Sequence, residues 1–286
     1  MTLKDKLTYR LLHVISMRMR RLSNQSRSRL ANQLGALAFN YIPIRKKQAF
    51  QNIKLAFPNK SDAWIYNVLK GAYRLVGSNF LEFMALPRSY ELLNFRIENQ
   101  HIIDKASQQG KGVLIITGHF GLWEILGSWL GKNDYPVWGI IQRQGNHGAD
   151  VFFKELRESY GMKHLYRKSS LDNMYKLLKE NNMLILASDQ DAKKRGVFVK
   201  FFGQPSSTPK GSAIFHLRSG APMVFSVAHR EKDGTIVISF SKIELNGSPS
   251  IETITQTYTN LLEQKVREHP DHYFWFHRKW KTKAII

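Results

Sequence analysis

The chain has 286 residues, of which 43% are hydrophobic and none is cysteine. This length and composition are enough for one large domain with a substantial core. The lack of cysteine excludes disulfides, thiol nucleophiles and cysteine-ligated metals. The net charge of +21 indicates an anionic partner, which could be nucleic acid, a membrane, a phosphorylated substrate or an acidic protein.

Residues 1–60 contain thirteen lysines and arginines and a single acid, Asp5, so they supply +12 of the net charge. Arginines alternate there with apolar residues at helical spacing: Leu7, Leu11, Val14, Ile15 and Leu22. This pattern is typical of a helix that lies in a membrane interface, where each Lys or Arg near an anionic leaflet adds roughly 1 kcal/mol. A solvated basic helix packed on the rest of the protein is the alternative.

No uncharged apolar run approaches the ~20 residues of a membrane-spanning helix, and the N-terminus lacks a signal-peptide pattern. We therefore expect the protein to stay in the cytoplasm, attached to the inner face of a membrane.

Beyond residue 60, helical and strand-like segments alternate. Ser61-Asp62 can cap a long helix over residues 63–86 that Pro87 closes. Further helices are predicted over residues 101–107, 123–130, 149–159, 171–179, 208–217 and 251–268. Strands are predicted over residues 113–117, 137–141, 183–187, 223–227 and 235–240. This order favours an α/β fold with a largely parallel sheet, divided into a basic helical region (1–60) and one catalytic domain (61–286).

Two turns are readable in this stretch. Thr208-Pro209 looks like a helix start, with a capping hydroxyl before a proline, and Gly220 can end that helix. Asp233-Gly234 predicts a hairpin turn between the last two strands.

The segment Gly112–Glu124 contains the most informative motif. A short apolar strand ends in Gly118-His119, and Glu124 follows five residues after the histidine, at the start of a helix. If His119 lies in the turn and Glu124 in the first helical turn, the carboxylate can reach back to the imidazole. Such a pair is a general base with an orienting acid.

This His-x4-Glu motif resembles that of the glycerolipid acyltransferases, and most closely that of the bacterial lipid A biosynthesis acyltransferases, the late lauroyl and myristoyl transferases. Three other segments strengthen the resemblance: Asn52–Pro58, Asp189–Gly203 and the aromatic, basic tail Tyr273–Trp280. The tail could contact lipid headgroups or pack as a C-terminal segment.

The resemblance implies that His119 is the general base and Glu124 its orienter. It also implies that Arg143, Arg157 and Arg167 bind substrate phosphate, a role that suits a planar guanidinium. Asp189 and Gln190 would shape the site and help to place the acceptor. Arg195, in the run Lys193-Lys194-Arg195, would contact acceptor phosphate or the membrane.

The resemblance further implies a donor, an acceptor and a place of action. The donor would be an acyl-acyl-carrier-protein, whose acidity suits a basic enzyme. The acceptor would be a phosphorylated glycolipid, a lipid A precursor at the cytoplasmic face of the inner membrane. We expect no metal or other cofactor.

Several alternatives stay open at this point. The acceptor could be another lysolipid, a mannolipid or an aminolipid. Asp189-x-Asp191 could mark a metal-dependent glycosyltransferase, although the adjacent cations would compete with a metal. The charge would also suit a nucleic-acid-binding protein, but no recognition motif is present and we expect no nucleic-acid partner.

Overall fold

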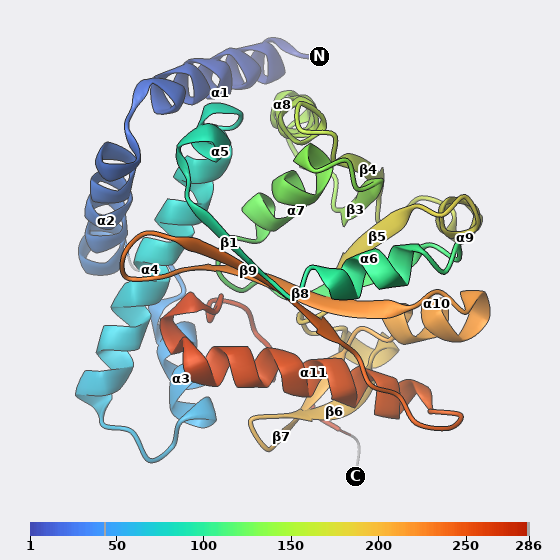
Figure 1. The fold of residues 1–286 in the computed structure, drawn as a ribbon. Helices are drawn as coiled ribbons and strands as arrows, with labels where there is room; N and C mark the ends of the chain where they lie inside the picture. The colour runs from blue at the N-terminus through green and yellow to red at the C-terminus, as the bar shows by residue number, and fades with distance from the viewer. Residues whose placement is uncertain (43, 285–286) are drawn as a thin grey trace.

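The computed structural model describes residues 1–42 and 44–284 and has the expected α/β fold (Figure 1). Seven strands form the main sheet in the order β1-β9-β8-β2-β5-β3-β4, and all neighbours are parallel except β8 and β9. Their bounds are β1 Phe95–Glu98, β2 Val113–Thr117, β3 Val137–Ile141, β4 Lys163–Tyr166, β5 Met183–Ala187, β8 Met223–Arg230 and β9 Ile236–Lys242.

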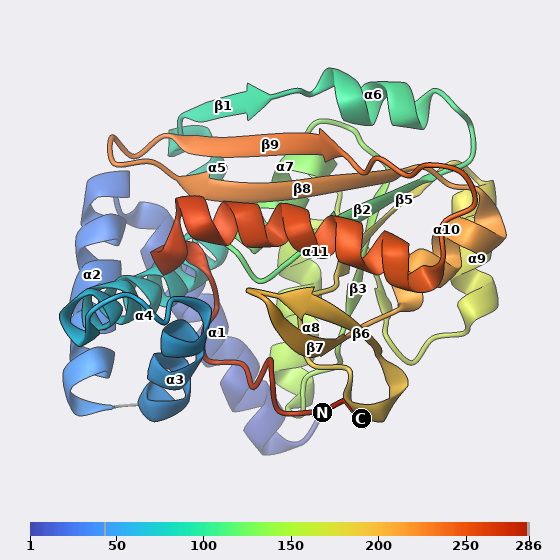
Figure 2. The same ribbon diagram turned by 90° about the horizontal axis from the view of Figure 1, so that it is seen from below.

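Helices cover both faces of the sheet, as Figures 1 and 2 show. Successive residues of β2 point into two different cores, because side chains alternate along a strand. Leu114 and Ile116 pack with α11, and Val113 and Ile115 pack with α7. The helices after residue 60 are α4 Asp62–Met84, α5 Arg88–Leu92, α6 His101–Ser107, α7 Trp123–Lys132, α8 His147–Glu158, α9 Leu171–Lys179, α10 Gly211–Ser219 and α11 Ile251–Glu268.

The basic N-terminal region forms three helices: α1 Leu3–Arg21, α2 Asn24–Tyr41 and α3 Lys46–Ala56. They pack on the rest of the protein: α1 contacts α8, and α2 and α3 contact α4. Within residues 1–42 and 44–284, no helix is both long enough and apolar enough to cross a bilayer.

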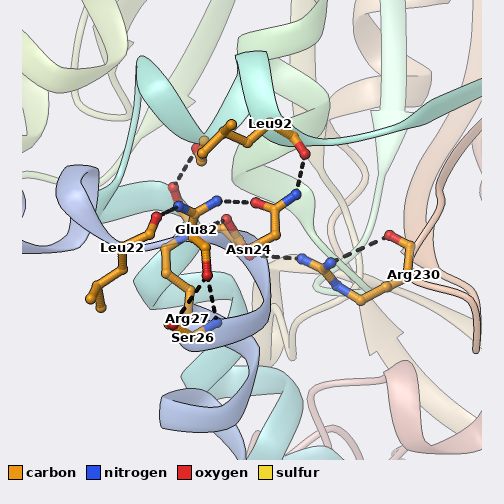
Figure 3. A network of polar contacts seen from close by, with 10 residues as sticks. Leu22, Asn24, Ser26, Arg27, Glu82, Leu92 and Arg230 are labelled. Atoms are coloured by element: carbon orange, nitrogen blue, oxygen red, sulfur yellow. Dashed lines mark hydrogen bonds and ion pairs between the residues drawn. The ribbon is translucent and has the colours of Figure 1, made fainter.

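A buried ionic cluster, which we call the Glu82 cluster, fixes the corner between α1 and α2 (Figure 3). Glu82 accepts hydrogen bonds from Arg27 Nε at 3.0 Å and from Arg230 Nη2 at 2.9 Å. Arg27 also donates to the Leu22 carbonyl at 2.6 Å, and Asn24 donates to the Leu92 carbonyl. One carboxylate therefore joins α2, α4 and β8.

The structure confirms most of the predicted elements, including the antiparallel turn at Asp233-Gly234 and the left-handed Gly220 after α10. The predicted helix start at Thr208 is wrong. Thr208 is the last residue of β7 (Gln204–Thr208), which pairs with β6 (Val197–Phe201) in a separate hairpin. The helix begins at Gly211 instead, because the backbone of Thr208 is engaged in the strand.

Candidate active site

Two turns at the carboxyl ends of neighbouring strands bring His119 and Asp189 together. Strands β2 and β5 are parallel and adjacent, with Thr117 paired to Ala187. His119 and Asp189 each lie two residues beyond these paired positions. The site thus lies at the carboxyl edge of the sheet, where α/β folds commonly bind ligands.

Asp189 holds His119 by two hydrogen bonds. The His119 ring atom Nδ1 lies 2.7 Å from Asp189 Oδ1, and the His119 backbone N–H donates to Oδ2 at 3.1 Å. A carboxylate at Nδ1 favours the tautomer with the proton on that nitrogen, which leaves Nε2 unprotonated and able to accept a proton. Gln190 places its amide nitrogen 3.3 Å from Nε2, and one quarter of the His119 side chain is exposed.

The electrostatics of the pair favour an ionised acid and a basic imidazole. Burial lowers the pKa of His119, but the charge and hydrogen bond of Asp189, with a further contribution from Glu124, outweigh it and raise the pKa above its ordinary value. Burial opposes ionisation of Asp189, but the charge and hydrogen bonds of His119 lower its pKa to about 2. Asp189 therefore stays ionised at neutral pH and can stabilise an imidazolium.

A segment from the far end of the chain, residues 272–274, closes the histidine turn, and we call it the C-terminal strap. The Phe274 N–H donates to the His119 carbonyl at 2.9 Å, and the Gly121 N–H donates to the His272 carbonyl at 2.7 Å. Gly121 has a φ of +58°, and a Cβ there would lie 1.8 Å from the Ala228 carbonyl oxygen. The turn therefore requires glycine at position 121.

Glu124 does not make the contact that the motif predicts. Its two carboxylate oxygens accept a bidentate pair of hydrogen bonds from Arg157, at 3.0 Å from Nε and 2.6 Å from Nη2. The expected Glu124–imidazole hydrogen bond is thus a misassignment, and Asp189 takes that place. The physical reason is that Glu124, in the first turn of α7, faces the planar guanidinium of α8, which matches a carboxylate at both oxygens.

The remaining predicted cations lie on the surface. Arg143 is 71% exposed, with its Nε 3.9 Å from Asp150 and its guanidinium 4.5 Å from the centre of the Tyr166 ring. Arg167 follows β4 and is exposed, and Arg195 is exposed in the short 3₁₀ turn Lys193–Arg195. Arg157, in contrast, is largely buried and pairs with Glu124.

Comparison with known proteins decides the family. The family model for bacterial lipid A biosynthesis acyltransferases matches residues 4–282. The chain belongs to this family. It is 25% identical over 262 residues to the lipid A biosynthesis palmitoleoyltransferase of Escherichia coli K12, covering 90% of this chain and 85% of the relative.

Two further relatives are similar. The lipid A biosynthesis lauroyltransferase of Escherichia coli K12 is 28% identical over 272 residues, covering 89% of this chain and 85% of the relative. A phosphatidylinositol mannoside acyltransferase of Mycobacterium tuberculosis (strain CDC 1551 / Oshkosh) is 24% identical over 182 residues, covering 62% of this chain and 57% of the relative. The protein is therefore an acyltransferase of the EC 2.3.1 type.

The acyltransferase has a further buried cation near Asp189 that sequence reasoning missed. Lys279 is 2% exposed, and its ammonium donates to Thr208 Oγ1 at 3.0 Å. A cavity of about 10 Å³ is lined by both Lys279 and Asp189. Burial lowers the pKa of Lys279 to about 8, and the neighbouring charges of Asp189 and Asp191 oppose that shift.

Of the two interpretations of the tail, the structure supports packing for its aromatic members. Tyr273, Trp275, Phe276 and Trp280 are buried, and Trp280 stacks on Phe201 with ring centroids 5.8 Å apart. The acyltransferase tail thus places Lys279 within its core. The sequence signal for this burial was the position of Lys279 between the aromatic residues Phe276 and Trp280.

The side chains around Asp189 and Asp191 do not match the metal site that was considered as an alternative. Asp189 is engaged with His119, and Asp191 accepts a hydrogen bond from Thr282 at 3.0 Å. In the part of the acyltransferase that the structure describes, no three His, Asp or Glu side chains are arranged to hold a metal ion.

Proposed function

We propose that the protein transfers a fatty acyl chain from an acyl-acyl-carrier-protein to a hydroxyl of a lipid A precursor, with His119 as general base. The main observation in support is the His119–Asp189 pair. The imidazole is fixed and partly exposed, and its Nδ1 is hydrogen-bonded to an ionised carboxylate. Membership of the lipid A biosynthesis acyltransferase family supports the choice of substrate class.

The proposed reaction needs no covalent acyl-enzyme. His119 Nε2 takes the proton of the acceptor hydroxyl while its oxygen attacks the thioester carbonyl carbon. The tetrahedral intermediate then collapses, the carbon–sulfur bond breaks, and the imidazolium returns its proton to the leaving thiolate. Asp189 stabilises the imidazolium throughout, and the Gln190 amide is a donor beside the reacting atoms.

In our proposal Glu124 supports this chemistry indirectly, without contacting the reacting atoms. Its charge contributes to the raised pKa of His119, and its pairing with Arg157 holds α7 against α8. We propose that Arg143, Arg167 and Arg195, which are exposed, are available for the phosphates of the acceptor.

We also propose that the protein works as a peripheral protein on the cytoplasmic face of the inner membrane. The outer face of α1 supports this, because Leu3, Leu7, Leu11, Val14 and Met17 are from 47% to 75% exposed there. Their spacing keeps them on one side of the helix, between exposed cations. The overall charge of +21 would favour capture of an acidic carrier protein.

A second acceptor class has specific support. A phosphatidylinositol mannoside acyltransferase aligns with 62% of the chain, so a mannolipid acceptor remains the alternative within the same chemistry. Deleting the gene in its native host and comparing the lipid A by mass spectrometry separates the two. Loss of one acyl group supports lipid A, and unchanged lipid A in a host without a redundant relative supports another acceptor lipid, of which the mannolipid is one.

The catalytic proposal is tested by His119→Ala with purified acyl-carrier-protein thioester and lipid A precursor. We expect kcat/KM to fall by roughly 10²–10⁴, the usual contribution of a positioned base. His101→Ala, which changes an exposed histidine at the start of α6, is the matched control and should keep full activity. Activity should also survive EDTA, and an active His119→Ala variant would refute the proposal.

A further inference from the structure

Three arginines surround a groove between α1 and α5, which we call the arginine groove. It has a volume of about 400 Å³ and is lined by Met17, Arg20, Arg21 and Arg88. Arg20 and Arg21 are the last two residues of α1, and Arg88 is the first residue of α5. The groove therefore concentrates three positive charges where two helix ends meet.

Within residues 1–42 and 44–284, no carboxylate forms an ion pair with Arg20, Arg21 or Arg88. The arginine ion pairs of the described residues involve other arginines, namely Arg27, Arg96, Arg143, Arg157, Arg230 and Arg267. The Nε of Arg20 is buried and has no hydrogen-bond partner within that same part of the chain. A buried donor without a partner is costly, so a ligand oxygen within reach of Arg20 would relieve that cost.

The groove is held in place from both sides. Ser16 donates to the Met84 carbonyl at 2.7 Å, which fixes α1 against the end of α4. The Glu82 cluster binds the Leu22 carbonyl just after α1, and Asn24 binds the Leu92 carbonyl at the end of α5 (Figure 3). The backbones that carry the three guanidiniums are therefore set before a ligand arrives, which lowers the entropic cost of binding.

The exposed apolar face of α1 continues directly into the groove. Met17 belongs to both, and Leu3, Leu7, Leu11 and Val14 extend the face along the helix. A helix that rests on a bilayer with these residues among the acyl chains presents its flanking cations at the depth of the lipid phosphates. Guanidinium groups bind phosphate oxygens in bidentate fashion.

We propose that the arginine groove binds the phosphate of an anionic membrane phospholipid and so fixes the orientation of α1 on the bilayer. The inference rests on the proposed membrane contact of α1, but not on the acyl-transfer chemistry. It assigns the groove to a lipid of the surrounding membrane, separate from the acceptor that reacts at His119.

The test compares two variants of the full-length protein that lose the same charge from the same surface. The groove variant is Arg20→Gln/Arg21→Gln/Arg88→Gln. The control variant is Lys4→Gln/Lys6→Gln/Arg10→Gln, which changes three exposed cations of α1 outside the groove. Binding is measured by co-sedimentation with vesicles of phosphatidylcholine, with and without phosphatidylglycerol.

We expect the groove variant to lose about tenfold more affinity for phosphatidylglycerol vesicles than the control, since one hydrogen bond between charged groups contributes about that factor. A third variant, Arg20→Lys/Arg21→Lys/Arg88→Lys, keeps the charge and should still bind less tightly than the wild type, because Lys cannot form bidentate contacts. Circular dichroism melting establishes that each variant is folded.

Each other outcome has a definite meaning. Equal losses in the groove and control variants would overturn the inference, because the attraction would then depend on charge alone. If the groove variant had a higher KM for the acceptor in detergent micelles than the wild type, the inference would also be overturned, because the groove would then hold the phosphate of the acceptor. If the wild type fails to bind phosphatidylglycerol vesicles, the proposed membrane contact fails as well, whereas the His119→Ala test is unaffected.

Discussion

Asp189 and Glu82 are both buried acids, but the structure surrounds them differently. Glu82 is 1% exposed and accepts from two arginines in the Glu82 cluster. Asp189 is equally enclosed, yet its ring partner His119 remains one quarter exposed. Two guanidiniums around Glu82 fix the orientation of three elements, whereas a partly exposed imidazole is suited to the proton exchange proposed for His119.

Glu124 and Arg157 form a third ion pair for comparison. Their side chains are 16% and 12% exposed, and both carboxylate oxygens are engaged by one guanidinium. An arginine keeps its protons at all ordinary pH values, whereas an imidazole can release one, so the kind of cation distinguishes the pair proposed to react from the two that support the fold. The variants below test that distinction, each at one of the three sites.

The largest effect is expected at Asp189. Asp189→Asn removes the charge that holds the His119 tautomer, and we expect kcat/KM to fall by roughly 10²–10⁴, as for other oriented histidine bases. The neutral imidazole is the reactive form, so activity rises as pH increases through the pKa of His119. Since Asp189 raises that pKa, the acid limb of the pH profile should move to lower pH in the variant.

The control for this prediction is Asp191→Asn in the same motif. Asp191 bonds Thr282 and makes no hydrogen bond to the imidazole within the described residues. The acid limb of the pH profile of Asp191→Asn should therefore coincide with that of the wild type. A shared shift in both variants would mean that the general charge of the motif, and not the Asp189 contact, sets the pKa of His119.

The next largest effect is expected in the Glu82 cluster. Glu82→Ala leaves Arg27 and Arg230 without their counter-ion, and we expect the free energy of unfolding to fall by about 3–5 kcal/mol. Urea denaturation measures this change. Glu231→Ala, which breaks the exposed pair with Arg96, should cost only about 0–1 kcal/mol, and similar losses at both sites would contradict the distinction.

The smallest effect is expected at Arg157. Arg157→Lys keeps the charge beside Glu124 but loses one of two hydrogen bonds, so we expect a drop in kcat/KM of about tenfold. Because the Glu124 charge remains in place, the acid limb of the pH profile should not move. A moved limb would show that Arg157 acts on the protonation of His119 and not only on the packing of α7 against α8.

The sequence was sufficient to predict most of the sheet and helices, because their hydrophobic patterns are strong. It could not reveal β1 and β4, which are four-residue strands with charged members, or β7, whose Pro and Ser residues are typical of a loop. Pairing with β6 overrides the local preference of β7.

At the site, local spacing predicted Glu124 as the hydrogen-bond partner of His119, whereas the structure pairs His119 with Asp189. His-x4-Glu is a pattern within one segment, whereas the contact with Asp189 depends on β2 and β5 being neighbours. Strand order is not encoded in periodicity. The available signal was that both residues directly follow buried apolar strands, whose carboxyl ends meet at one edge of a parallel sheet.

The C-terminal strap also has a consequence for biosynthesis. His119 and Gly121 emerge from the ribosome well before Phe274 and His272, which form hydrogen bonds to them. Contacts so distant along the polypeptide form late in folding. We therefore expect a nascent chain to lack acyltransferase activity until residues 272–274 have docked on the turn that carries His119.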